Sequence, residues 1–130
     1  MQHDANTLPP IDNNLFTGVD VGGTKVEITD TSGPNLNRFN TGDYASLEEI
    51  LTQYIAGSGS RPARIVIGMA GPRNDETGAV QLTNGTWPTF EPGVASEKFG
   101  IPIVTTNDMV VTAAGVMHSQ DLVIKTLHSG

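Results

Sequence analysis

The segment that most restricts the fold is Phe16-Thr-Gly-Val-Asp-Val-Gly-Gly-Thr-Lys-Val-Glu-Ile-Thr-Asp30. Apolar and β-branched residues occur at strand density in residues 16–21 and again in residues 25–30, and a Gly-Gly pair separates the two runs. This pattern predicts two antiparallel strands joined by a tight turn at Gly22 and Gly23. The segment therefore predicts a β-hairpin near the start of these residues.

The same turn carries groups that suit a phosphate. Glycine tolerates positive φ and lets backbone N–H groups approach an anion, while Thr24 adds a hydroxyl donor. Asp20, at the end of the first strand, is placed to hold Mg²⁺ directly or through water. An ordinary hairpin is the alternative, because Gly-rich turns are common. Neither the Walker loop nor the dinucleotide loop fits, since the segment after the glycines alternates like a strand instead of opening a helix.

The rest of the chain alternates between strand and helix signals. Ser46 and Glu49 form a capping-box pattern before an apolar stripe at helical spacing, which residues 57–60, Gly-Ser-Gly-Ser, bring to an end. The near-continuous apolar run at 64–70 predicts a strand buried on both faces. Further elements are predicted as strands at 36–40 and 101–106 and helices at 92–99 and 109–117. The order predicts an α/β domain with a mixed sheet flanked by helices.

The composition excludes several classes of partner. Fourteen acidic residues against seven basic ones give a net charge of −7, which opposes binding to nucleic acid or to an anionic membrane. The absence of cysteine excludes a disulfide framework and a Cys-type zinc site, and it is compatible with a cytoplasmic protein. Residues 1–14 are polar without a hydrophobic centre, so they are expected to be a flexible lead-in and not a secretory signal. No apolar stretch approaches the roughly 20 residues that span a bilayer.

Three polar points follow apolar strands, namely Asp20, Gly71-Pro72 and Asn107-Asp108. In open α/β sheets ligands bind beyond the carboxyl ends of the strands, so three parallel strands would bring these points to one cleft. Asp108 is the candidate for proton transfer, because the helix expected after it favours an ionised carboxylate. The alternative is that Asn107 and Asp108 merely cap that helix.

Asp20-Val-Gly-Gly-Thr-Lys25 resembles the first phosphate motif of the sugar kinase, actin and Hsp70 superfamily, and most of all that of bacterial glucokinases and the related ROK kinases. Thr105-Thr-Asn-Asp108 and Thr83-Asn-Gly-Thr-Trp-Pro88, which follows Ala70-Gly-Pro72, resemble further glucokinase segments in the same order. The resemblance covers nearly the whole chain after its polar start. It implies a ribonuclease H-like fold, with residues 15–130 as the N-terminal lobe and the second lobe not among these residues.

This resemblance implies transfer of the γ-phosphate of ATP, with Mg²⁺, to the 6-hydroxyl of glucose or a related hexose. Asp108 would be the catalytic base. The hexose would be bound by Gly71, Asn84, Asn107 and Asp108, and the nucleotide phosphates by Asp20, Gly22, Gly23, Thr24 and Lys25. Trp87 is expected instead to anchor a loop in the core.

Two interpretations of the 130 residues stay open at this point. They form the N-terminal domain of a longer kinase, with negligible activity alone, or a sugar-binding or oligomerising module that assembles as a homodimer or swapped oligomer through residues 57–60. The acidic charge and the lack of a basic helix-turn-helix segment disfavour a transcriptional regulator. These residues do not decide between hexoses, or between ATP, ADP and polyphosphate as donor.

Overall fold

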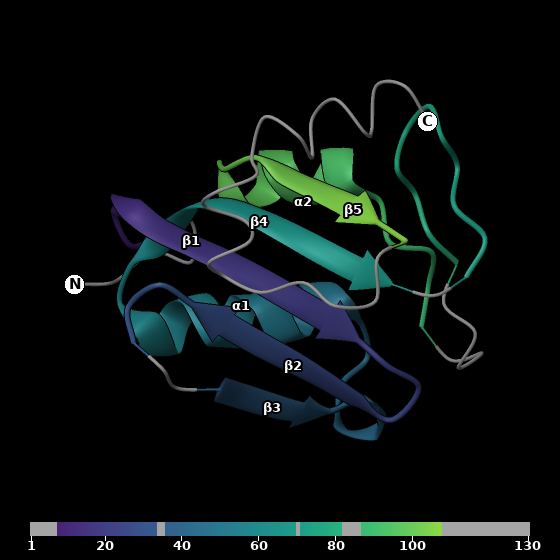
Figure 1. Cartoon of the computed structure of the whole chain (residues 1–130), viewed down its shortest axis with the longest axis horizontal. Coiled ribbons are helices and arrows are strands. Elements are labelled where there is room, and N and C mark those ends of the chain that lie inside the picture. Colours follow the sequence, from purple (N-terminus) through teal and green to yellow (C-terminus); the bar gives the residue numbers. More distant parts are fainter. Residues whose placement is uncertain (1–7, 34–35, 70, 82–86, 108–130) are drawn as a thin grey trace.

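The computed structural model describes residues 8–33, 36–69, 71–81 and 87–107. These residues form a five-stranded sheet in the order β3-β2-β1-β4-β5, with two α-helices (Figure 1). In chain order the elements are β1 (Ile11–Val21), β2 (Lys25–Asp30), β3 (Leu36–Asn40), a 3₁₀ turn (Thr41–Asp43), α1 (Leu47–Ser58), β4 (Arg61–Met69), α2 (Pro92–Phe99) and β5 (Ile103–Thr106). The predicted α/β class with a mixed sheet is confirmed, while the helix expected at 109–117 lies outside the described residues.

The direction of the strands brings three carboxyl ends to one edge of the sheet. β1, β2 and β3 are antiparallel neighbours, whereas β1, β4 and β5 are parallel. A parallel pair needs a crossover connection, and α1 and α2 lie in the two segments that lead into β4 and β5. The parallel arrangement expected from the sequence is therefore confirmed.

Both helices cover the same face of the sheet, and Figure 1 shows them behind the strands. The buried core joins apolar side chains of both helices to those of the strands: Val19, Val21, Val26, Ile28, Leu47, Ile50, Leu51, Tyr54, Ile55, Ile65, Ile67, Met69, Ala95, Phe99 and Ile103 are among its members. A smaller apolar group, Val66 with Phe16 and Val104, lies on the opposite face. Residues 65–69 are all buried, as predicted for a strand covered on both sides.

Helix α1 begins as the sequence predicts and ends later. The Ser46 hydroxyl accepts a hydrogen bond from the Glu49 N–H at 3.2 Å. The Glu49 carboxylate accepts from the N–H of Ala45 at 2.7 Å and not from that of Ser46, so it binds one residue further back than a standard capping box. The helix continues through residue 58, and Gly59, with φ 78°, forms its left-handed cap.

Three strand starts differ from the predicted ones. β1 begins at Ile11, within the segment expected to be a flexible lead-in, because residues 11 and 12 pair with the start of β4 before an irregularity that ends at Phe16. The exposed polar residues of this extension carry no hydrophobic pattern that would reveal a strand. β4 accordingly begins at Arg61, whose side chain donates to the carbonyls of Pro9 and Phe99. β5 begins at Ile103, after Pro102, which has no N–H to donate.

Candidate phosphate and sugar site

The turn between β1 and β2 is a three-residue loop, residues 22–24. The hairpin is as predicted, but the two-residue Gly-Gly turn with positive φ is wrong, because neither Gly22 nor Gly23 has a positive φ. The Gly22 N–H donates to the Lys25 carbonyl at 2.9 Å and closes the loop. A Cβ atom on Gly23 would have no neighbour within 4 Å, so this backbone is open to an approaching group.

Thr41 fixes the orientation of this loop from the start of the 3₁₀ turn. Its hydroxyl donates to the Gly23 carbonyl at 3.1 Å, and its N–H donates to the Thr24 carbonyl at 2.9 Å. Carbonyl and N–H point in opposite directions across a trans peptide, so the Thr24 N–H points away from Thr41. Within the described residues, neither this N–H nor the Thr24 hydroxyl has a hydrogen-bond partner. Both donors are therefore available to an anion.

Asp20 lies on the face of the sheet opposite the helices. The hydroxyl of Thr17 bonds to Tyr54 of α1, so alternation along β1 turns Thr17 and Val19 toward the helices and Asp20 away from them. Asp20 pairs with Gly68 of β4, which in turn pairs with Thr106 of β5. The three residues form a row across the carboxyl ends of the parallel strands, with no side chain at its centre.

Charges of both signs surround Asp20. Lys25 is exposed and Glu27 pairs with Asp20 across β1 and β2, so alternation along β2 places both on the face that carries Asp20. Arg38 of β3 forms a 3.0 Å ion pair with Glu27. In the part of the chain that the structure describes, no three His, Cys, Asp or Glu side chains gather as a metal cluster. Mg²⁺ is commonly held by one or two carboxylates together with water and substrate phosphates, so Asp20 fits that limited role.

Gly71, which follows β4, is required by the backbone. Its φ is +133°, and a Cβ atom there would overlap the carbonyl group of Gln81. The Gln81 N–H donates to the carbonyl of Pro72 at 3.2 Å, so the chain folds back on itself directly after Gly71. This turn accounts for Gly71 by geometry, separately from any contact with a sugar.

Asn107 follows the last paired residue of β5 and is exposed. Asp20, Gly71 and Asn107 thus lie at the ends of β1, β4 and β5, at the same edge of the sheet, as the sequence predicts. Asn84 and Asp108, expected to contact the hexose, lie outside the described residues.

The glucokinase family model matches residues 18–130. The chain belongs to the glucokinase family. Among curated proteins no significant match was found. Solved structures share the fold at 20–24% identity: a glucokinase from an Antarctic psychrotroph (TM-score 0.60, 20% identity) covers 72% of this chain, and a ROK family glucokinase from Streptomyces griseus in complex with glucose and AMPPNP (0.54, 24%) also covers 72%. A ROK hexokinase from Thermus thermophilus (0.53, 22%) covers 70%.

The match is to part of these structures only. It covers 33% of the psychrotroph and Streptomyces chains and 34% of the Thermus chain. This glucokinase-family chain therefore spans about a third of the length of its structural relatives. No helix within the described ranges is long and apolar enough to cross a membrane.

Trp87 anchors the chain after the gap at residues 82–86, as predicted. Its side chain is 3% exposed and belongs to the core cluster. The indole Nε1–H donates to the carbonyl of Tyr44 at 2.8 Å, which ties Trp87 to the segment between the 3₁₀ turn and α1. The buried indole has a structural role in the described part of the domain.

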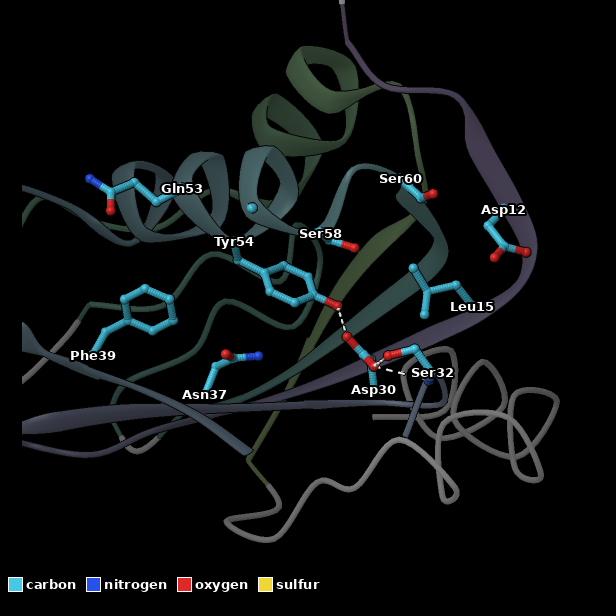
Figure 2. Close-up of a pocket in the computed structure, with 11 residues that line it drawn as sticks. Asp12, Leu15, Asp30, Ser32, Asn37, Phe39, Gln53, Tyr54, Ser58 and Ser60 are labelled. Atoms are coloured by element: carbon cyan, nitrogen blue, oxygen red, sulfur yellow. Dashed lines mark hydrogen bonds between the residues drawn. The ribbon is translucent and has the colours of Figure 1, made fainter. Parts of the chain in front are cut away.

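A cavity of about 390 Å³ lies at the other end of the hairpin, away from the loop (Figure 2). None of the residues predicted to bind phosphate or sugar lines it. In it the Tyr54 hydroxyl donates to Asp30 Oδ2 at 2.5 Å and lies 2.9 Å from the hydroxyl of Thr17, while Ser32 donates to the other carboxylate oxygen. Burial, followed by the hydrogen bond to Asp30, raises the pKa of Tyr54 well above its ordinary value. This network joins α1 to the sheet.

Proposed function

We propose that the complete protein that contains these residues transfers the γ-phosphate of ATP to the 6-hydroxyl of a hexose, with glucose as the preferred substrate. The observation that carries the proposal is the common edge of β1, β4 and β5, where Asp20, the loop at 22–24 and Asn107 lie together in a chain of the glucokinase family. The Streptomyces relative that holds both glucose and AMPPNP, an analogue of ATP, supports the same pair of substrates.

On the phosphate side, hydrogen-bond donors of the loop at 22–24 would bind the negatively charged phosphates of the nucleotide. The Thr24 N–H and hydroxyl, with the open backbone of Gly23, would bind phosphate oxygens, and Lys25 would add a positive charge nearby. The N–H of Gly22, predicted to bind phosphate, instead donates to the Lys25 carbonyl within the loop. Asp20 would hold Mg²⁺ together with the phosphates, which supplies charge neutralisation when the metal is bound. Local donors are needed here, because the chain as a whole carries a net charge of −7.

On the sugar side, Gly71, Asn84 and Asn107 would position the hexose, since an amide both donates to and accepts from a hydroxyl. Asp108 would accept the proton of the 6-hydroxyl as its oxygen bonds to the γ-phosphorus and the bond to the β-phosphate oxygen breaks. The products are the hexose phosphate and ADP, with the proton on Asp108.

The 130 residues alone are proposed to have negligible turnover. They span about a third of the structural relatives, and phosphoryl transfer to a sugar requires water to be excluded from the reacting phosphate. We also propose that the protein is cytoplasmic and that it assembles as a homodimer or swapped oligomer. Only two residues, Gly59 and Ser60, connect α1 to β4, so an exchange at 57–60 would require part of α1 to open.

The test is ADP release from ATP by the complete protein with and without sugar. Glucose is expected to raise ADP release far above the rate with water alone, and mannose and N-acetylglucosamine measured in parallel identify the preferred hexose. Equal ADP release with and without every sugar would reject the proposed function. Formation of the hexose phosphate with ATP, ADP or polyphosphate as donor tests the assignment of ATP, because ADP release cannot report on the other two donors.

A further inference from the structure

The end of β5 has a strand neighbour on one side only in the described sheet. β5 pairs with β4 up to Gly68 and Thr106, and no described strand lies on its other side. Asn107 follows immediately. Side-chain contacts of the last residues of β5 therefore add to the backbone pairing with β4 in holding Asn107 in place.

Thr105 supplies two such contacts through its hydroxyl group. The hydroxyl donates to the Gly78 carbonyl at 2.6 Å and accepts from Nε of Arg73 at 3.2 Å. Thr105 is 1% exposed, so water does not compete for either bond. Gly78 has φ +78°, and a Cβ atom on it would lie 3.0 Å from Pro92 and 3.1 Å from the Thr105 hydroxyl. Only glycine lets this loop approach β5 so closely.

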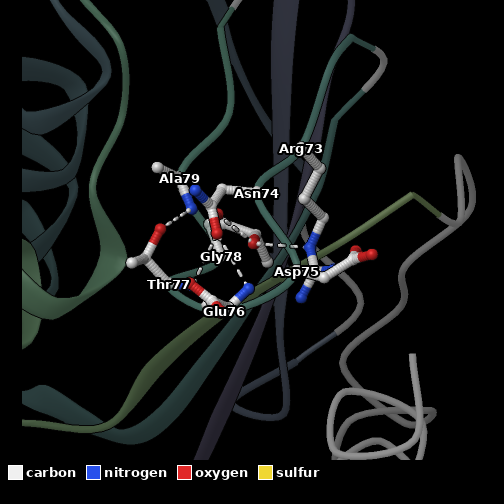
Figure 3. A network of polar contacts seen from close by, with 8 residues as sticks. Arg73, Asn74, Asp75, Glu76, Thr77, Gly78 and Ala79 are labelled. Atoms are coloured by element: carbon white, nitrogen blue, oxygen red, sulfur yellow. Dashed lines mark hydrogen bonds and ion pairs between the residues drawn. The ribbon is translucent and has the colours of Figure 1, made fainter.

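The loop that carries Arg73 is closed on itself (Figure 3). Asn74 N–H donates to the Ala79 carbonyl at 2.8 Å, and Gly78 N–H donates to the Asn74 carbonyl at 2.7 Å. The side-chain oxygen of Asn74 also accepts from the N–H groups of Glu76 and Thr77. The backbone of Arg73 is thereby fixed, so its guanidinium reaches Thr105 from a defined place.

The burial of Arg73 is not explained by its ion pair. Its side chain is only 8% exposed, whereas that of its partner Asp75, 3.1 Å away, is 66% exposed. A pair with one exposed partner contributes little stability, while burying a guanidinium costs free energy. The second partner of the guanidinium is Thr105, two residues before Asn107. The contact with Thr105 thus gives Arg73 a role at the end of β5.

We infer that Arg73 is a positioning residue for the hexose: it holds Thr105 and so sets the place of Asn107. The inference rests on the proposed function, because Asn107 is a sugar ligand only in a hexose kinase. Arg73 acts through Thr105 and is not assigned a contact with the sugar. Its loss should therefore weaken hexose binding while leaving nucleotide binding unchanged.

The first measurement uses the 130-residue chain and no substrate. In ¹H–¹⁵N correlation spectra, Arg73→Gln should shift the amide resonances of Thr106 and Asn107. Thr105→Val, which removes only the hydroxyl, should shift the same resonances, and it provides the readout if Arg73→Gln fails to fold. Arg38→Gln, which breaks an exposed ion pair on β3, is the matched control and should leave them in place. Unshifted resonances of Thr106 and Asn107 in the Arg73 and Thr105 variants would overturn the inference.

The second measurement is steady-state kinetics of the complete protein. Arg73→Gln should raise the KM for glucose about tenfold, the effect expected when one buried hydrogen-bonded contact is lost, with the KM for ATP unchanged. Arg73→Lys, which keeps the charge but not the fork of donors, should lie between wild type and Arg73→Gln. Combining Arg73→Gln with Thr105→Val should add little to the larger single effect, because both remove one link.

Equal rises in the two KM values, or none, would overturn the role of Arg73 toward the hexose. A wild-type protein without sugar-dependent ADP release would instead reject the proposed function. The spectra of the 130-residue chain would then still decide whether Arg73 positions Asn107, so the two failures are distinguishable.

Discussion

Asp20 on β1 lies directly opposite Gly68 on β4, on the face of the sheet away from both helices. Because glycine has no side chain, the space beside the Asp20 carboxylate is bounded by backbone, and the next side chain across the sheet is that of Thr106. A carboxylate at the end of the strand that leads into the loop with the Thr24 donors is suited to a metal-bound phosphate. The geometry gives Asp20 a role that its place in a hairpin alone does not.

Asp20→Asn should lower kcat of the complete protein about a hundredfold or more, because a neutral amide holds Mg²⁺ poorly and metal neutralisation of phosphate charge is worth several kcal/mol. The measurement is ADP release at saturating glucose over a range of Mg²⁺. Glu27→Gln, on the facing strand and in an exposed ion pair, is the control and should stay within about threefold of wild type. An Asp20→Asn protein with wild-type kcat and Mg²⁺ dependence would remove Asp20 from the metal site.

Thr41→Val should loosen the loop at 22–24, because it deletes the hydroxyl that binds the Gly23 carbonyl and keeps the N–H bond to Thr24. Urea unfolding should show a loss of about 1 kcal/mol, the usual value of one hydrogen bond. The KM for ATP should rise several-fold while that for glucose is unchanged. Thr52→Ala, which removes an exposed hydroxyl on α1, serves as control. Equal KM values for ATP in wild type and Thr41→Val would show that Thr41 does not orient the phosphate loop.

Gly71→Ala should destabilise the domain by at least about 2 kcal/mol, because φ +133° is strained for any L side chain and the added Cβ would overlap the Gln81 carbonyl. Gly57→Ala in α1 should instead stabilise the domain. A Cβ atom there has no neighbour within 4 Å, and alanine is the better helix former by about 0.5–1 kcal/mol. Thermal unfolding of the two variants should move Tm in opposite directions. Equal Tm values for Gly71→Ala and wild type would contradict the backbone assignment.

The network of Tyr54 predicts how stability depends on pH. Its pKa in the folded protein is raised above the ordinary value of 10.0, chiefly by burial and then by the hydrogen bond to Asp30. As the pH rises through 10, the unfolded chain releases the tyrosine proton first, so the free energy of unfolding should fall by up to about 1.4 kcal/mol per pH unit. Tyr54→Phe should remove this contribution to the decrease in the free energy of unfolding above pH 10. Tyr44→Phe, whose hydroxyl makes only a 3.4 Å bond, should retain it. Identical pH profiles for Tyr54→Phe and wild type would disprove the link.

Periodicity predicted the elements that pack a core. The helix at 92–99 and the buried run inside β4 were visible, since their apolar side chains pack in one core. The strand at 36–40 was also predicted, although only Phe39 of it packs against that core. The extension of β1 to Ile11 was not visible, because the side chains of residues 11–14 are exposed and the pairing with residues 61 and 62 depends on a long-range contact. Gly59 explains the late end of α1: a left-handed cap lets the helix include Gly57 and Ser58.

The sequence predicted the site residues at the ends of the strands, but it did not predict the residues that hold them in position. Asp20 and Asn107 follow apolar strands, a local pattern, and the parallel topology brings them to one edge. Thr41 and Arg73 act through contacts 18 and 32 residues away in sequence, with Gly23 and Thr105. No spacing in the sequence marks a threonine after a strand or an arginine in a turn, so only the fold reveals them.

Substitution of the proposed base tests whether these residues belong to a hexose kinase. Asp108→Asn in the complete protein should reduce glucose-dependent ADP release at least about a thousandfold, because an amide cannot accept the hydroxyl proton, while calorimetry should show glucose binding within a few-fold of wild type. Asp121→Asn, thirteen residues further along the chain, is the matched control. Turnover of Asp108→Asn equal to that of wild type would show that Asp108 is not the base of a hexose kinase.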